Sequence, residues 1–259
     1  MMADPDARSR PAGAGDAGYT TTEEFMAAAI AREVRDGEQA AVGTISPIPA
    51  AGVLLAYWSH APRVRPIIIN SDEWWPFRLG SKEFYEFAQK GRLDLFFLSG
   101  GQIDRWGNLN TITVGDHERP KLRLPGGAGS AMLYYWAKRV VVFRMEHSPK
   151  IFVERVDCVT SPGTSPPSVT RPGGPQVVIT PLCVFGFHEE ERALRVESLH
   201  PGVSPEDLRA RTGFPLAVSA STPVTPAPTP EQLELLRTRV RPALARIYPV
   251  FARSAFPVA

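Results

Sequence analysis

The sequence of 259 residues has few of the features that mark secreted, membrane or metal-binding proteins. It contains only two cysteines, Cys158 and Cys183, neither at C-x-x-C spacing, which argues against a disulfide framework and against a zinc site. No apolar run approaches the roughly 20 residues of a membrane span. The N-terminus also lacks the apolar segment of a signal peptide. We therefore expect a cytoplasmic protein with two buried thiols, no membrane contact and no metal.

The chain also lacks a large excess of positive or negative charge. The chain has 29 basic and 27 acidic residues, and no long Lys/Arg run, so nucleic acid is not expected as a partner. Hydrophobic residues make up 43% of the chain, enough for a packed core. Proline is abundant, with 26 residues, and concentrates in two stretches. We expect an extended loop at 161–175 and a Pro/Thr-rich linker at 219–230.

Helical and strand patterns alternate along the chain. Thr21 and Glu24 form a capping-box signature that begins a helix, which ends near Gly37. The strongest strand signals are the buried apolar runs 67–69, 93–98 and 140–143. Further strands are expected at 40–44, 177–179 and 182–187, and further helices at 49–60, 81–90 and 204–212. This order predicts an α/β fold, an open parallel sheet sandwiched between helices.

The same pattern divides the chain into four parts. Residues 1–18 have hardly any large apolar side chain and are expected to form a disordered leader. An α/β domain is expected at 19–218, followed by the linker at 219–230. Residues 231–259 carry an apolar stripe from Leu233 to Ile247, which predicts a C-terminal helix docked on the core or on a partner.

The glycine-rich segment 125–130 is a candidate for binding an anion or an oxyanion. Glycines allow backbone amides to approach a ligand closely. No Lys-Ser/Thr pair follows them, so a phosphate loop is excluded. A dinucleotide loop stays open, although Met132 occupies the place of the third glycine. A glycine turn with no ligand is the remaining alternative.

Two polar clusters follow predicted strands, where parallel sheets bind ligands. The first, at 99–111, holds Gln102, Asn108 and Asn110, whose amides either bind a substrate carbonyl or close turns. The second joins Asp72 and Glu73 to two tryptophans, as a perturbed acid or as an exposed turn. The five histidines have no metal-ligand spacing and are interpreted as surface or capping residues.

Four ordered motifs resemble the β subunit of class I CoA-transferases over about residues 22–215. Residues 101–110 are similar to that family's G-x-Q-x-D-x-x-G-N-x-N signature, and 125–130 to its glycine-rich loop. Residues 152–163 resemble its F-V-E…V-T-S-P-G segment, and 199–214 its H-P-G-V…T-G-F pattern. The resemblance implies the class I CoA-transferase fold.

One departure from the family pattern affects the expected activity. Transferases of this family carry a nucleophilic glutamate at a strand end, where this chain has Asn70. An amide cannot form the acyl anhydride that this chemistry requires. The loss resembles a steroid ring-cleaving hydrolase branch of the family, in which the catalytic glutamate belongs to the α subunit. The aromatic residues at 74–75 and 134–136 would suit a bulky apolar substrate, or else belong to the core or a subunit interface.

This resemblance implies hydrolytic carbon–carbon cleavage in a steroid-derived cyclic ketone CoA thioester. It implies an α subunit as partner in a heterotetramer, and coenzyme A only as part of the acyl-CoA substrate, with no separate cofactor. Glu73 is a weak catalytic candidate. The expected substrate- or oxyanion-binding residues are Asn70, Ser71, Gly101, Gln102, Asn108, Asn110, Gly126, Gly127, Gly129 and Ser130. A true CoA-transferase using Glu73 or Asp72, and a non-catalytic CoA-ester-binding module, remain alternatives.

Overall fold

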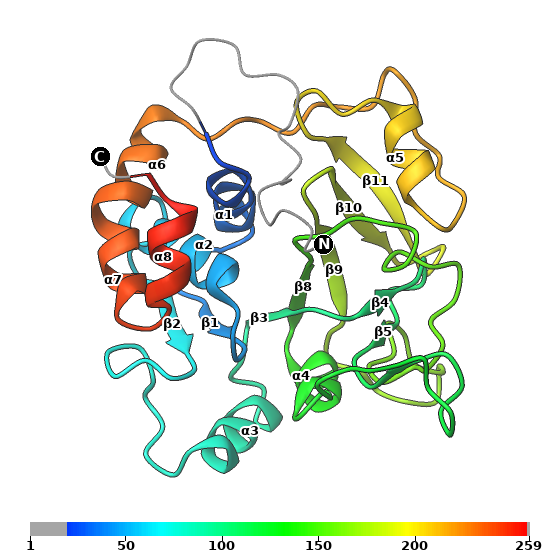
Figure 1. The fold of residues 1–259 in the computed structure, drawn as a ribbon. Coiled ribbons are helices and arrows are strands. Elements are labelled where there is room, and N and C mark those ends of the chain that lie inside the picture. Colours follow the sequence, from blue (N-terminus) through cyan, green and yellow to red (C-terminus); the bar gives the residue numbers. More distant parts are fainter. Residues whose placement is uncertain (1–19, 258–259) are drawn as a thin grey trace, which may run out of the picture.

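The computed structural model describes residues 20–257, so the expected leader lies outside the described residues. Its centre is a seven-stranded sheet in the order β11-β10-β9-β8-β3-β1-β2 (Figure 1). The strands are β1 (Gln39–Val42), β2 (Arg65–Ile68), β3 (Leu95–Leu98), β8 (Arg139–Phe143), β9 (Pro175–Ile179), β10 (Cys183–His188) and β11 (Ala193–Leu199). The pairings from β2 to β9 are parallel, whereas β10 is antiparallel to both neighbours. The α/β sheet is confirmed, with an antiparallel hairpin at one edge that the sequence did not predict.

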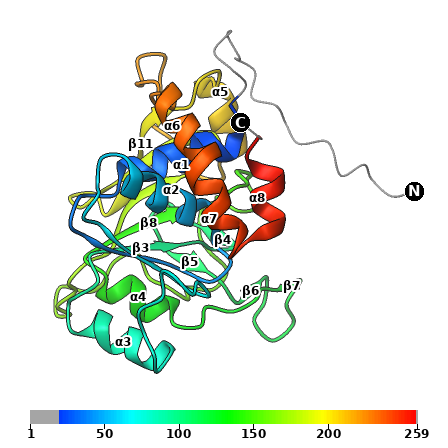
Figure 2. The same ribbon diagram turned by 90° about the vertical axis from the view of Figure 1, so that its left-hand side faces the viewer.

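Helices cover both faces of the sheet (Figure 2). One layer contains α1 (Thr22–Arg32), α2 (Pro47–Trp58), α6 (Pro230–Leu235), a π-helical turn η1 (Leu236–Val240), α7 (Arg241–Ala245) and α8 (Pro249–Ala255). The opposite layer contains α3 (Ser81–Gln89) and α4 (Ser130–Trp136). Two small hairpins, β4 (Gln102–Ile103) with β5 (Leu109–Asn110) and β6 (Thr113–Val114) with β7 (Leu122–Arg123), and the helix α5 (Pro205–Arg211) complete the fold.

The capping residues that the sequence suggested do begin their helices. The Thr21 hydroxyl accepts a hydrogen bond from the Glu24 amide, and the Glu24 carboxylate accepts one from the Thr21 amide. Ser204 caps α5 by accepting from the Asp207 amide. α1 and α2 cross closely at Gly52, which has no side chain. A Cβ there would lie only 2.4 Å from Cγ2 of Ile30. The two helices therefore bury their apolar faces within this chain.

The C-terminal segment packs on the core instead of extending away from it. Leu236, Val240 and Leu244 are fully buried against the α1–α2 layer. Arg237 also binds the buried carboxylate of Glu24, with its Nε 2.7 Å from Oε1. The expected single helix is divided into α6, η1, α7 and α8. The 219–230 segment, expected to be a linker, is hydrogen-bonded to the end of β11 through Leu199.

Two of the five histidines are buried, which corrects their interpretation as surface or capping residues. His147 is 7% exposed and lies 2.9 Å from Thr180 Oγ1 and 3.0 Å from Thr212 Oγ1 through its two ring nitrogens. His200 is 5% exposed and contacts Thr225 Oγ1. Burial lowers the pKa of His147 to about 3 and that of His200 to about 4. Cys183 is also buried, whereas Cys158 is only half-buried, contrary to expectation.

The buried histidines predict a loss of stability in mild acid. Both pKa values are below the ~6.5 of an unfolded histidine, so the unfolded state binds protons that the folded state does not. Their combined effect should lower the free energy of unfolding by about 4 kcal/mol between pH 7.5 and pH 5. Denaturant unfolding at both pH values measures this difference. The double variant His147→Gln/His200→Gln should show a clearly smaller difference, and an unchanged one would contradict the assignment.

Candidate active site at the carboxyl edge of the sheet

Strained backbone marks the loops that follow the central strands. Four non-glycine residues among residues 20–257 have positive φ: Ile45 (53°) after β1, Asn70 (68°) after β2, Ala128 (42°) before α4, and Arg192 (53°) between β10 and β11. Such a conformation is costly, above all for a β-branched residue such as Ile45, and it concentrates at functional sites. The carboxyl ends of parallel strands are also where α/β sheets bind ligands. Both arguments place the candidate site at this edge.

The turn after β2 leaves the side chain of Asn70 exposed. The Ser71 amide donates to Ile68 O, and the buried Ser71 hydroxyl accepts from the Trp74 amide at 3.0 Å. Ser71 therefore holds the turn. Asn70 is exposed, and its side chain makes no hydrogen bond with any residue in the described range 20–257. Its side-chain amide is free to donate to, or accept from, a substrate.

The acidic residues of this turn are exposed. Glu73 lies at the surface, with Oε2 3.5 Å from Arg246 NH1 and 53% of its side chain exposed. Trp74 packs edge-on against Tyr57, and Trp75 packs against Phe77 and Phe84. The tryptophans are thus used in packing, and no apolar wall surrounds the Glu73 carboxylate. The exposed turn, one of the two alternatives, fits this geometry.

The glycine loop leaves three consecutive amides without a partner. The Gly126 amide donates to Thr111 O, and the Ser130 amide donates to Gly127 O. Among the described residues, the amides of Gly127, Ala128 and Gly129 donate to no acceptor. A run of free amides in a loop with left-handed residues forms a concave anion-binding surface. The loop can stabilise a negative oxygen.

Close packing fixes the position of this loop. A Cβ on Gly127 would lie 2.5 Å from Ser130 Oγ and 2.9 Å from Thr111 Oγ1, and one on Gly129 would lie 2.4 Å from the Tyr85 ring. The Thr160 hydroxyl accepts from the Thr111 amide at 3.0 Å. Side chains are therefore excluded at both glycines. The V-T-S-P-G segment supports the loop indirectly, through the hydrogen bond between Thr160 and Thr111.

The amide cluster at 102–110 faces inward. Gln102 Nε2 donates to Asp157 Oδ2 at 3.0 Å, and Asn110 Nδ2 donates to Gln102 Oε1 at 2.7 Å. Asn108 Nδ2 donates to Asp104 Oδ2 at 3.0 Å. The Asn108 and Asn110 side chains thus hold local turns, whereas Gln102 joins this segment to the distant Asp157. Gly101 allows Leu124 to pack closely against this segment, since a Cβ at position 101 would lie 2.5 Å from Leu124 Cδ1.

Asp104 is a structural residue that the sequence analysis did not assign. Its fully buried carboxylate accepts hydrogen bonds from the amides of Trp106 and Asn108 as well as from the Asn108 side chain. Burial raises its pKa, while the hydrogen bonds from Asn108 act in the opposite direction. Its place in the G-x-Q-x-D signature was the available signal.

The structure argues against a dinucleotide loop. The strand before the glycines, β7, pairs only with β6 in a separate hairpin and is not part of the seven-stranded sheet. A dinucleotide fingerprint needs a sheet strand leading directly into the loop. Glu146, the acid near the position where a dinucleotide-binding fold would need a ribose ligand, is exposed and accepts a hydrogen bond from the Ser148 hydroxyl.

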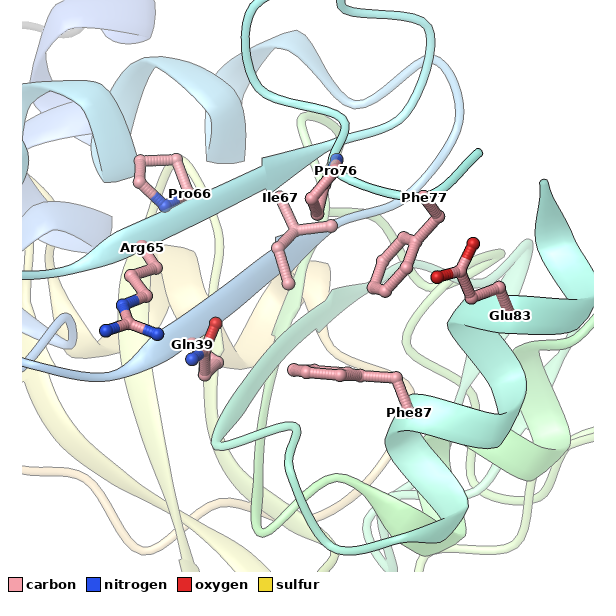
Figure 3. Close-up of a pocket in the computed structure, with 8 residues that line it drawn as sticks. All are labelled: Gln39, Arg65, Pro66, Ile67, Pro76, Phe77, Glu83 and Phe87. Atoms are coloured by element: carbon pink, nitrogen blue, oxygen red, sulfur yellow. The ribbon is translucent and has the colours of Figure 1, made fainter. Parts of the chain in front are cut away.

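A cavity of about 370 Å³ lies at the other end of the strands (Figure 3). Gln39 and Arg65, the first residues of β1 and β2, line it together with Phe77 and Phe87. Asn70 follows the opposite end of β2, so this cavity is separate from the candidate site. No helix among residues 20–257 is long and apolar enough to span a membrane, and that same range holds no cluster of ligands suited to a metal ion.

Comparison with known proteins identifies the family. The sequence matches the Coenzyme A transferase family over residues 75–211. The chain belongs to this family. It is 32% identical to one of the subunits of 3-oxoadipate CoA-transferase from Pseudomonas knackmussii, covering 84% of this chain and 92% of that protein. It is 26% identical to the cholesterol ring-cleaving hydrolase IpdB subunit of Mycobacterium tuberculosis, covering 88% and 97%. The solved glutaconate CoA-transferase of Acidaminococcus fermentans superposes with a TM-score of 0.74 at 28% identity, covering 89% and 98%.

As a coenzyme A transferase family member, the protein should depend on its glycine loop. Gly127→Ala places a methyl group 2.5 Å from Ser130 Oγ and 2.9 Å from Thr111 Oγ1, and we expect the loop to shift to relieve these contacts. We expect turnover of the assembled enzyme to fall by about 10² or more, the effect of losing an oxyanion donor. Gly91→Ala, at a positive-φ glycine with open space after α3, is the matched control. A folded Gly127→Ala enzyme with normal turnover would show that the loop is only a turn.

Proposed function

We propose that this chain is the β subunit of a heteromeric hydrolase with the CoA-transferase fold. Its substrate would be a steroid-derived cyclic ketone carried as a CoA thioester, in which one ring carbon–carbon bond is cleaved. The proposal rests on the identity of residue 70. At the strand end where transferases of this family have their glutamate, this chain has Asn70, whose side-chain amide makes no hydrogen bond within residues 20–257. An amide can bind an oxygen but cannot become an acyl anhydride.

The free amides suit the charge that such a reaction develops. Water adds its oxygen to the ring ketone carbon, and the bond from that carbon to its neighbour breaks. The oxygen stays in a new carboxylate, and the electron pair of the broken bond forms an enolate, which takes up a proton. The amides of 127–129 and the Asn70 side chain would donate to the negative oxygen, the largest kind of catalytic stabilisation.

The base for this reaction would come from the partner. Glu73 and Asp72, the acids of the β2 turn, are exposed, and Glu73 is turned toward Arg246. We therefore assign the catalytic glutamate to an α subunit, with the two chains forming a heterotetramer. The 3-oxoadipate CoA-transferase relative and the IpdB relative are both named as subunits, which supports a second chain.

A true CoA-transferase is the second candidate. It is favoured by the 32% identity to the 3-oxoadipate CoA-transferase subunit, which exceeds the 26% identity to the IpdB subunit. In this case Glu73 or Asp72 would have to act as the nucleophile, because Asn70 cannot. The Glu73 carboxylate would first have to leave Arg246.

Oxygen labelling distinguishes the two candidates. The complex of this chain with its α subunit is incubated in ¹⁸O water with a steroid-derived cyclic ketone CoA thioester, and the product is analysed by mass spectrometry. Hydrolysis predicts one ¹⁸O atom in the new carboxylate while the thioester stays intact. CoA exchange onto an added free carboxylate, without ring opening and with an adduct that hydroxylamine traps, would overturn the proposal.

Two substitutions in the β2 turn give a second test. Glu73→Gln should keep more than a tenth of the wild-type rate, since supporting groups typically contribute about tenfold. Asn70→Glu should damage the native reaction, because a new carboxylate facing the α-subunit glutamate raises the pKa of one of the pair and moves the pH optimum upward. Glu86→Gln, at an exposed acid paired with Lys82, is the control. Complete loss of activity in a folded Glu73→Gln complex would instead support the transferase.

A further inference from the structure

The β6–β7 hairpin projects from the body of the protein (Figure 2). Thr113 pairs with Arg123 and Val114 with Leu122, and both residues of β7 are exposed. The chain then runs directly from β7 into the loop, where Leu124 and Gly126 donate to the carbonyls of Ile112 and Thr111. The hairpin is therefore anchored at the candidate active site and free at its tip.

Three basic side chains of this hairpin have no acidic partner among residues 20–257. Arg119, Lys121 and Arg123 are exposed, and none of them forms an ion pair within residues 20–257. Alternation along an extended chain puts Lys121 and Arg123 on the same side of the hairpin. Arg123 uses one N–H group to bind His117 O, so its other N–H groups are free.

The acids of the hairpin do not neutralise these cations. The Asp116 carboxylate accepts hydrogen bonds from the amides of Glu118 and Arg119, which lowers its pKa and keeps it in the turn. Glu118 is exposed and forms no ion pair among the described residues. The side with Lys121 and Arg123 therefore presents unpaired positive charge.

This charge lies within reach of a ligand held at the free amides. Arg123 is four residues from Gly127, so their Cα atoms are at most about 14 Å apart. A CoA thioester has its reacting group at one end of a long, flexible pantetheine arm and its phosphates at the other. With the thioester at 127–129, the phosphates can extend along the hairpin.

We propose that Arg119, Lys121 and Arg123 form the binding site for the phosphate groups of the CoA part of the substrate. Arginine and lysine pair with phosphate through charge-assisted hydrogen bonds. The proposal rests on the proposed function only in taking a CoA thioester as the ligand, and it holds equally for the hydrolase and for the transferase.

The opposite side of β7 shows a different chemistry. Leu122 is 55% exposed there, a surface that another protein subunit would cover. A basic hairpin that only joins subunits would affect assembly, whereas one that binds phosphates would affect coenzyme affinity. The experiment below measures both quantities.

The test uses the complex of this chain with its α subunit and free coenzyme A, measured by titration calorimetry at low salt. The variant is Arg119→Gln/Lys121→Gln/Arg123→Gln. We expect about tenfold weaker binding of coenzyme A, since each exposed charge contributes modestly, and the difference should shrink as salt screens the charges. Pantetheine, which has no phosphate, should bind both proteins equally. No turnover is needed, so the result is independent of the reaction catalysed.

The matched control neutralises three exposed cations near the amino ends of the strands, Arg35, Lys90 and Arg92, and should bind coenzyme A as the wild type does. Unchanged affinity in the hairpin variant would overturn the proposal. So would equal losses for coenzyme A and pantetheine, which would indicate a distorted site. Failure of the hairpin variant to assemble with the α subunit would also overturn it and assign the hairpin to the subunit interface.

Discussion

The hydrogen bond between the side-chain amides of Asn110 and Gln102 holds the carboxyl edge of the sheet in shape. Asn110 is completely buried, and its Oδ1 accepts from the amides of Ile112 and Thr113, which turns the chain into β6. A buried amide without partners would cost about 1–3 kcal/mol, so the network favours one conformation of this segment. Thr111 O in turn accepts a hydrogen bond from the Gly126 amide, and this bond fixes the position of the glycine loop. The position of the amides at 127–129 therefore depends on the buried side chains of Asn110 and Gln102.

Much of the fold and part of the site could be predicted from local sequence. Buried strands appear as apolar runs, and Thr21, Ser204 and Thr229 begin helices through hydrogen bonds within a single turn. Asn70 and Gly127 could be selected because each follows or precedes an element whose end is visible in the sequence. The availability of their amides could not be predicted, because it depends on the absence of partners elsewhere in the chain.

The features that the sequence assigned wrongly or left open depend mostly on contacts between distant segments. His147 is buried because Thr180 and Thr212, 33 and 65 residues away, supply hydroxyls to its ring. Gln102 turns inward because Asp157, 55 residues away, accepts its hydrogen bond. An asparagine or glutamine can close a turn or bind a substrate with the same chemistry, so its direction is set by the fold. Trp74 and Trp75 pack against Tyr57 and Phe84, partners that an apolar residue's type does not specify.

The turn that carries Asn70 also protects the edge of the sheet. β2 is an edge strand, and an unprotected edge invites pairing with other chains. Pro66 has no N–H group to offer, and the amide of Ile68 donates to Trp74 O at 3.0 Å. For Trp74 to reach Ile68 the chain must reverse at residues 70–73, which gives Asn70 its positive φ. The backbone there is thus set by the sheet edge, and asparagine is one of the few non-glycine residues that adopts this conformation readily.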